Sequence, residues 1–181
     1  MVEYRLYFLG NPKILVGNRE IKLSRKKSLA LLSIVAVPDV NPVRSRITGL
    51  FWPDKDESHG RGALRTTLST LNSELGQNLI VSEGDYLYLE DSVWVDVKEF
   101  REKIREMDKG DFFNAQLNQK LTQAAGLYSG DFLSGFSIGS EALEFDEWQY
   151  MQQENLRRSF SKVLKRLVQS LMRNLIAIFL E

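Results

Sequence analysis

The chain has 181 residues, of which 43% are hydrophobic and 27% charged, a composition typical of a soluble globular protein with one large domain or two small ones. It contains no cysteine and one histidine, His59, which excludes disulfides and thiolate metal sites and leaves almost no residues for a catalytic triad. No apolar stretch is long enough to cross a bilayer and no signal peptide is recognisable, so we predict a cytoplasmic protein without a metal, a cofactor or a membrane partner.

The net charge is zero, but the charges are unevenly distributed along the chain. Residues 1–80 hold 12 Lys and Arg against 7 Asp and Glu, whereas residues 81–100 hold one basic residue and six acidic ones. A basic segment favours polyanions through the release of counterions, although an excess of five charges is weak support by itself.

Short strands are predicted at the start of the chain and again near residue 80. Residues 4–9, 14–16 and 21–23 are aromatic or aliphatic segments separated by turn residues, and they indicate a small antiparallel sheet. Residues 79–81 and 86–89 flank a Glu-Gly-Asp turn and indicate a β-hairpin. The tip of this hairpin is acidic, which disfavours its insertion into a DNA groove.

Three helices are predicted between the sheet and the hairpin. The first has Ser24 or Ser28 as a candidate N-cap, and the second starts after Asn41-Pro42 and stops at the next proline. The third ends at Gly76 and carries leucines at spacings of four, three and four residues: Leu64, Leu68, Leu71 and Leu75. These are the elements of a winged helix-turn-helix, to which we assign residues 1–94.

Residues 95–181 are predicted to form an all-α domain, so that the chain as a whole is α+β. Asp96 followed by Glu99 resembles a capping box, and apolar residues at helical spacing mark three helices beyond it. Residues 174–180 are apolar on almost every side. We therefore expect either that the helical domain is incomplete at residue 181 or that its last helix is buried against a second copy.

The third helix has a polar face with the side chains that DNA recognition needs: Ser58, Arg61, Arg65, Thr66, Ser69, Asn72 and Ser73. Arginine can bind guanine or phosphate, asparagine can bind adenine, and serine and threonine permit close approach. No acidic residue lies on this face between Ser58 and Ser73. Every amphipathic helix has a polar face, so a merely solvated surface is the alternative.

Basic residues also gather at the starts of the first two helices: Arg25, Lys26, Lys27, Arg44 and Arg46. Positive charge at a helix N-terminus opposes the helix dipole, so helix stability does not account for it. Contact with backbone phosphates is the functional interpretation, and a solvated basic surface is the alternative. His59 is interpreted as a surface or phosphate-contacting residue and not as a catalyst.

Two groups of motifs follow one another along the chain. The first is Leu-Ala-Leu-Leu at 29–32, Pro-Val-Arg-Ser-Arg at 42–46, Leu-Phe-Trp-Pro-Asp at 50–54 and Ala-Leu-Arg-Thr-Thr-Leu-Ser-Thr-Leu at 63–71. The second is Val-Asp-Val-Lys-Glu-Phe at 95–100, Leu-Tyr-Ser-Gly-Asp-Phe-Leu-Ser-Gly-Phe at 127–136, Glu-Trp at 147–148 and Glu-Asn-Leu-Arg at 154–157. Together they resemble the Streptomyces antibiotic regulatory protein (SARP) family, in which an OmpR-type winged helix precedes a tetratricopeptide-like bacterial transcriptional activator domain.

The resemblance implies a transcriptional activator that binds double-stranded promoter DNA and recruits RNA polymerase. Carried over position by position, it places these residues on the recognition helix or on the segment before it: Arg61, Arg65, Thr66 and Ser69, and Arg44, Ser45 and Arg46. The loop from Trp52 to His59 matches the candidate polymerase contact. The helical domain would mediate self-association or contact with partners.

Two features depart from the family pattern: the acidic hairpin tip, and Gly60 and Gly62 in the first turns of the third helix. With the neutral net charge, the acidic tip leaves a second interpretation open, a protein-interaction module whose winged helix no longer binds DNA. The third interpretation is an enzyme, and it has the least support because the chain has one histidine and no cysteine.

Overall fold

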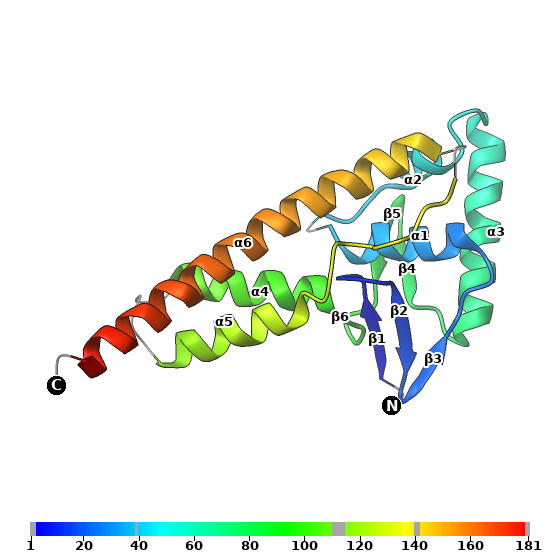
Figure 1. The fold of residues 1–181 in the computed structure, drawn as a ribbon. Coiled ribbons are helices and arrows are strands. Elements are labelled where there is room, and N and C mark those ends of the chain that lie inside the picture. The colour runs from blue at the N-terminus through cyan, green and yellow to red at the C-terminus, as the bar shows by residue number, and fades with distance from the viewer. Residues whose placement is uncertain (1–2, 39, 110–114, 140–141, 180–181) are drawn as a thin grey trace.

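The computed structural model describes residues 3–38, 40–109, 115–139 and 142–179, and it shows an α+β chain in two parts (Figure 1). A small sheet, three helices and a hairpin form a winged helix, and three further helices extend away from it as an arm. This arrangement confirms the predicted fold class.

The sheet of the winged helix has four strands, in the order β3-β2-β1-β6. The first three are antiparallel, as predicted: β1 (Tyr4–Tyr7), β2 (Lys13–Val16) and β3 (Arg19–Ile21). The fourth, β6 (Trp94–Val95), pairs with β1 in parallel. The boundary predicted between residues 94 and 95 therefore falls inside a strand of the first sheet.

Three helices and a hairpin complete the winged helix: α1 (Lys26–Ala36), α2 (Arg44–Phe51), α3 (Glu57–Leu75), β4 (Ile80–Glu83) and β5 (Tyr86–Leu89). Most of α1 is buried, and Leu64 and Leu71 of α3 are fully buried. The helix ends at Gly76, whose φ of 71° is the left-handed conformation that glycine adopts without strain. The leucine pattern therefore predicted the buried face of this helix, and Gly76 predicted its end.

The predicted N-cap of α1 is wrong. Arg25 occupies the cap position and its side chain makes no capping hydrogen bond. The hydroxyl of Ser24 instead donates to the carboxylate of Glu74 at the far end of α3, and Ser28 is buried inside the helix. Ser24 therefore bonds to a distant helix, and its local sequence could not indicate that partner.

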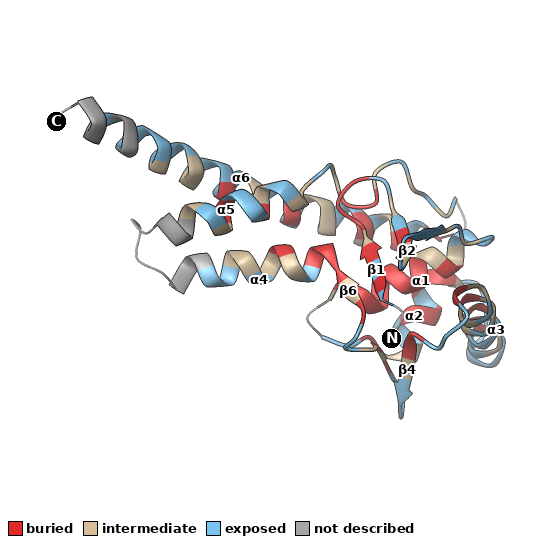
Figure 2. Ribbon diagram, turned by 90° about the horizontal axis from the view of Figure 1, so that it is seen from below, coloured by how far each residue is buried: buried red, intermediate tan, exposed pale blue. Residues whose placement is uncertain are grey.

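The arm consists of α4 (Asp96–Lys109), α5 (Ala115–Leu127) and α6 (Leu143–Phe179), which lie side by side and extend away from the sheet (Figures 1 and 2). Buried residues are concentrated at the base of the arm, and exposure increases toward the far end of α6 (Figure 2). No described helix is long and apolar enough to cross a membrane. Most side chains of the apolar segment at 174–180 lie outside the described residues, so that expectation stays a prediction.

Asp96 joins the two parts of the chain. Its carboxylate is buried and accepts the backbone N–H groups of Phe8 and Leu9 at 2.8 Å each and of Val97 at 2.7 Å. The predicted capping box, in which Asp96 and Glu99 would cap the helix together, is therefore wrong. The Glu99 carboxylate forms an ion pair with Lys103 instead. One carboxylate thus connects the end of β1 with the start of α4.

The loop at 129–136 reinforces this joint. The carbonyl of Phe8 accepts the N–H of Leu133, and the N–H of Gly10 donates to the carbonyl of Asp131. A Cβ on Gly130 would approach the Cα of Gly10 to 3.3 Å, so the two backbones meet where side chains would not fit. Phe8 also packs edge-on against Phe132, and a single hydrophobic core runs through both parts.

We predict that Asp96→Ala lowers the free energy of unfolding by about 3 kcal/mol, because the substitution leaves three buried N–H groups without an acceptor. Urea denaturation at neutral pH measures this change. Asp91→Ala is the matched control, since Asp91 is exposed on the preceding loop. An equal, small effect of both substitutions would contradict the role given to Asp96.

Burial raises the pKa of Asp96 from 3.8 to about 6, against the opposing effect of the three N–H groups. Between these values the folded chain holds a proton that the unfolded chain has released, so the free energy of unfolding decreases as the pH rises from about 4 to 6. Carboxyl carbon resonances followed by NMR should show a midpoint near 6, and Asp96→Asn should remove this part of the pH dependence of unfolding. A midpoint below 4 would refute the prediction.

Candidate nucleic-acid interface

The α3 helix lies at the end of the molecule opposite the arm, with its outer face open to solvent (Figures 1 and 2). Its inner face packs against α1 and α2. A Cβ on Gly60 would meet the Cβ of Thr48 at 3.3 Å, so this glycine allows α2 and α3 to cross closely. Gly62 has no atom within 4 Å of such a Cβ, and nothing in its surroundings requires glycine.

The structure brings most of the predicted recognition residues together on that outer face. The exposed residues are Ser58, Arg61, Arg65, Thr66 and Ser69. Arg65 makes no ion pair with any described residue, whereas Arg61 pairs with Glu57 at 2.8 Å. The sequence predicted a face without acidic residues from Ser58 onward. Glu57, one residue earlier, is acidic and pairs with Arg61, one of the two arginines on this face. The spacing of four residues between Glu57 and Arg61 could have predicted this ion pair from the sequence.

Asn72 lies apart from the arginines. It is half-buried, and its Oδ1 atom is buried without a hydrogen-bond partner among the described residues. It lines a groove of about 430 Å³ between α3 and the hairpin, together with Leu68, Asn78 and Ile80. Its amide therefore faces the hairpin side of α3.

The start of α3 is held by a local cap. The Asp56 carboxylate accepts the backbone N–H of His59 at 3.0 Å and lies 2.5 Å from its Nδ1 atom. The backbone N–H of His59 holds the pKa of Asp56 below its usual range, and the contact with the imidazole acts in the same direction. The exposed His59 is thus part of a helix cap, in agreement with its interpretation as a surface residue.

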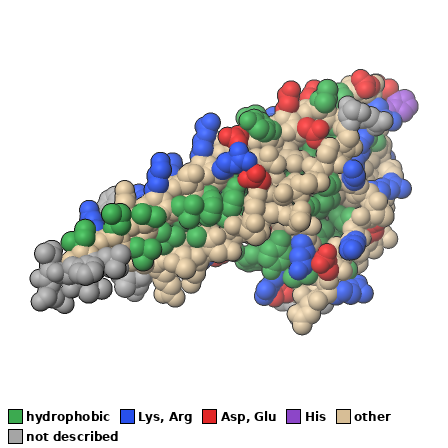
Figure 3. Space-filling model, in the orientation of Figure 1, with side chains coloured by type: hydrophobic (Ala, Val, Ile, Leu, Met, Phe, Trp, Pro, Cys, Tyr) green, Lys and Arg blue, Asp and Glu red, His purple; other side chains and the backbone are tan. Residues whose placement is uncertain are grey.

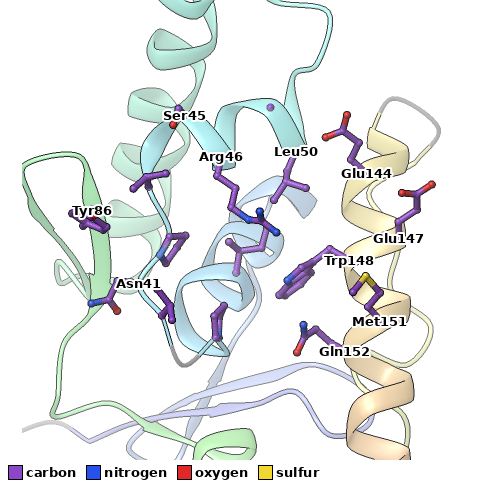
Figure 4. A pocket seen from close by; sticks show the side chains of 16 residues that line it. Asn41, Ser45, Arg46, Leu50, Tyr86, Glu144, Glu147, Trp148, Met151 and Gln152 are labelled. Carbon is purple, nitrogen blue, oxygen red and sulfur yellow. The ribbon is translucent and has the colours of Figure 1, made fainter.

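At the start of α2, Arg44 and its neighbours have different surroundings. Arg44 donates from its guanidinium to the Ser82 hydroxyl at 2.7 Å and from its backbone N–H to the Asp85 carbonyl, so it ties α2 to the hairpin. Ser45 and Arg46 are exposed. The Arg46 side chain extends over a groove of about 970 Å³ between α2 and the start of α6 (Figure 4).

The two lysines at the start of α1 also differ. Lys26 is exposed and makes no ion pair with a described residue. Lys27 is half-buried, donates to the Phe51 carbonyl at 3.1 Å and lies 5.2 Å from the centre of the Trp52 ring. These contacts connect α1 to the end of α2, and the sequence offered no signal for them because the partners lie 24 residues away.

The acidic residues of the hairpin lie at its exposed turn, where Gly84 has a φ of 58°. Glu83 and Asp85 flank this turn, and Tyr86 beside it is half-exposed. The tip therefore presents negative charge beside the start of α2, where the Arg44 N–H bonds to the Asp85 carbonyl, and this charge repels phosphate there.

No protein-family model matches the chain, and no curated protein matches its sequence. Among solved structures, the chain is similar to Mycobacterium tuberculosis EmbR in complex with a low-affinity phosphopeptide, at a TM-score of 0.68 and 13% identity. The match covers 98% of this chain and 50% of that one, so this chain spans half the length of the EmbR chain. At this identity the likeness shows a shared fold, and at that level it agrees with the SARP resemblance.

The two lysines provide a direct test of these assignments. We predict that Lys27→Ala lowers the free energy of unfolding by about 1–2 kcal/mol, because it removes a charge-assisted hydrogen bond and the contact with Trp52. Its neighbour serves as control, since Lys26→Ala should change the urea midpoint little. Equal midpoints for the two variants would show that Lys27 does not stabilise the packing of α1 on α2.

Proposed function

We propose that the chain is a sequence-specific DNA-binding transcriptional regulator that places the outer face of α3 in the major groove. The observation that carries the proposal is the open face itself: five polar side chains, with Arg65 unpaired among the described residues, at the end of the molecule away from the arm. The winged-helix fold and the likeness to EmbR support it.

The size of α3 suits this role. Its 19 residues span roughly 28 Å, and the major groove admits an α-helix along its floor. Arg65 is assigned to a guanine edge or a phosphate, and Thr66 and Ser69 to close contacts on the same face. Arg61 has to exchange its ion pair with Glu57 for a contact with DNA, which makes it the weaker contributor. Asn72 is assigned to a base edge on the hairpin side.

Phosphate contacts are assigned to exposed polar residues at the starts of α1 and α2. Lys26, Ser45 and Arg46 are open to solvent, so they can reach a backbone without breaking a described ion pair. Lys27 and Arg44 already bond within the protein, so we assign them to positioning α1, α2 and the hairpin beside the DNA.

We further propose that the segment from Trp52 to His59 and the arm serve the activation of transcription. The segment from Trp52 to His59 is exposed from residue 53 onward, lies at the start of α3 and holds three acidic residues. It is therefore accessible to a second protein while the outer face of α3 is bound, and we assign it to contact with RNA polymerase. The arm is assigned to self-association or to a partner.

One set of observations favours a protein-interaction module without DNA binding. The hairpin tip is acidic, and Arg44 and Arg61 are engaged inside the protein. The two functions differ in salt dependence, because a protein that neutralises several phosphates loses affinity steeply as salt rises. A flat salt dependence would support the module.

We predict that Arg65→Ala weakens binding to a duplex selected from a random library by about 10- to 100-fold at about 0.1 M salt, the value of one bidentate base contact. Fluorescence anisotropy gives the affinity. Arg158→Ala is the matched control, because Arg158 is also exposed and unpaired among the described residues but lies on the arm. Identical binding by Arg65→Ala and the wild type would remove α3 as the recognition helix.

Arg46 is expected to behave differently. Arg46→Ala should weaken binding to selected and random duplexes alike and reduce the slope of log affinity against log salt by about 1, as for one lost phosphate contact. A loss confined to the selected duplex would instead assign Arg46 to base recognition.

A further inference from the structure

The far half of α6 carries an apolar stripe that the fold leaves uncovered. It consists of Leu164, Val168, Leu171, Met172 and Ile176, which are between 42% and 59% exposed, and we call it the α6 stripe. Figure 3 shows hydrophobic side chains gathered along the arm beside a row of Lys and Arg side chains. Exposed apolar side chains in such a row mark an interaction site more often than a solvated surface.

The stripe lies beside the face that holds α6 in the arm. On that packed face Leu156 and Val163 are buried, and Phe160 stacks on Tyr128 with ring centres 4.2 Å apart. The apolar surface of α6 is therefore wider than the part that packs in the arm, and the stripe is the part without a partner among the described residues.

The charges beside the stripe have one sign. Residues 155–180 hold six Lys and Arg and no Asp or Glu. Arg157 is used internally, since it bonds to Asp131 at 2.6 Å and to Glu154 at 2.6 Å. Arg158, Lys162 and Lys165 are exposed and make no ion pair with a described residue, and at helical spacing they share one side of α6, before and beside the first turn of the stripe.

This charge pattern disfavours an antiparallel pair of α6 stripes from two copies of the chain, because that pairing brings two basic edges together. It also differs from a membrane-surface helix, which presents a broad apolar face with basic residues on both sides. Here the exposed Lys and Arg residues lie on one side of the apolar residues, which follow spacings of three and four, as in packed helices.

We propose that the α6 stripe is the docking site of an amphipathic helix from a partner protein, with Asp and Glu along one flank. Its apolar face would cover the α6 stripe, which spans about 18 Å or three turns, while its acidic flank pairs with Arg158, Lys162 and Lys165. The surface lies at the opposite end of the molecule from α3, so a partner can occupy it whether or not α3 holds DNA.

The test uses the full chain and two synthetic helical peptides of about 18 residues, identical except that Glu on one flank of the first is Lys in the second. The acidic peptide should bind at least about tenfold more tightly than the basic one, and salt should reduce the difference. Fluorescence anisotropy of the labelled peptides measures both affinities. Equal affinities, or no binding of the acidic peptide, would overturn the proposal.

Variants locate the site. Lys162→Glu with Lys165→Glu should weaken the acidic peptide at least about tenfold, and Lys22→Glu with Lys98→Glu should leave it unchanged at the same net charge. Val168→Ser with Leu171→Ser should also weaken it about tenfold, and because both side chains are exposed, the circular dichroism spectrum should stay that of the wild type. The proposal would be overturned if the affinity for the acidic peptide stayed unchanged in Lys162→Glu with Lys165→Glu or in Val168→Ser with Leu171→Ser.

Two other occupants have distinct signatures. A dimer seen by sedimentation velocity and lost in Val168→Ser with Leu171→Ser would assign the stripe to a second copy. Cosedimentation with vesicles containing phosphatidylserine, lost in the same variant, would assign it to a lipid surface. Either result would replace the partner helix.

Discussion

The bonding of the Asp96 carboxylate to the end of β1 is the constraint on which the rest of the structure depends. Because it is buried and accepts the N–H groups of Phe8, Leu9 and Val97, the first helix of the arm has to start at the edge of the winged-helix sheet. The parallel strand β6 and the bonds of the 129–136 loop to the same end of β1 strengthen this joint. The two parts therefore share one hydrophobic core and behave as one unit, although each has its own pattern of elements.

The joint also decides which surfaces stay open. With the arm attached at β1, its three helices extend away from α3, and the outer face of α3 is covered by no described residue. The orientation of that face is set on the opposite side, where Leu64 and Leu71 are buried and the close contact at Gly60 brings α2 alongside. The open outer face of α3 is thus a consequence of where the arm is attached.

Basic residues serve two purposes in this chain, and the structure separates them. One group is bonded internally and positions elements: Lys27, Arg44, Arg61 and Arg157. Others are exposed without a described ion pair, among them Lys26, Arg46, Arg65, Arg158, Lys162 and Lys165. Of these six, the first three lie on the winged helix and the last three lie on α6. Under the two proposals, the residues on the winged helix would contact the phosphates and bases of DNA and those on α6 the acidic flank of a partner, so neither ligand would block the other.

Sequence periodicity determined the helices, the hairpin and the order of the two parts, because apolar spacing and turn residues act locally. It also placed Arg65, Thr66 and Ser69 on one exposed face, since that depends only on the geometry of a helix whose buried side is known. Only the tertiary structure decided what the charged side chains bond to. Lys27 and Lys26 are adjacent and alike in sequence, yet one packs on Trp52 and the other is solvated. Asp96 has the sequence context of a helix cap but bonds to a strand 87 residues earlier, because the partner of a buried carboxylate is set by which backbone groups the fold leaves unpaired beside it.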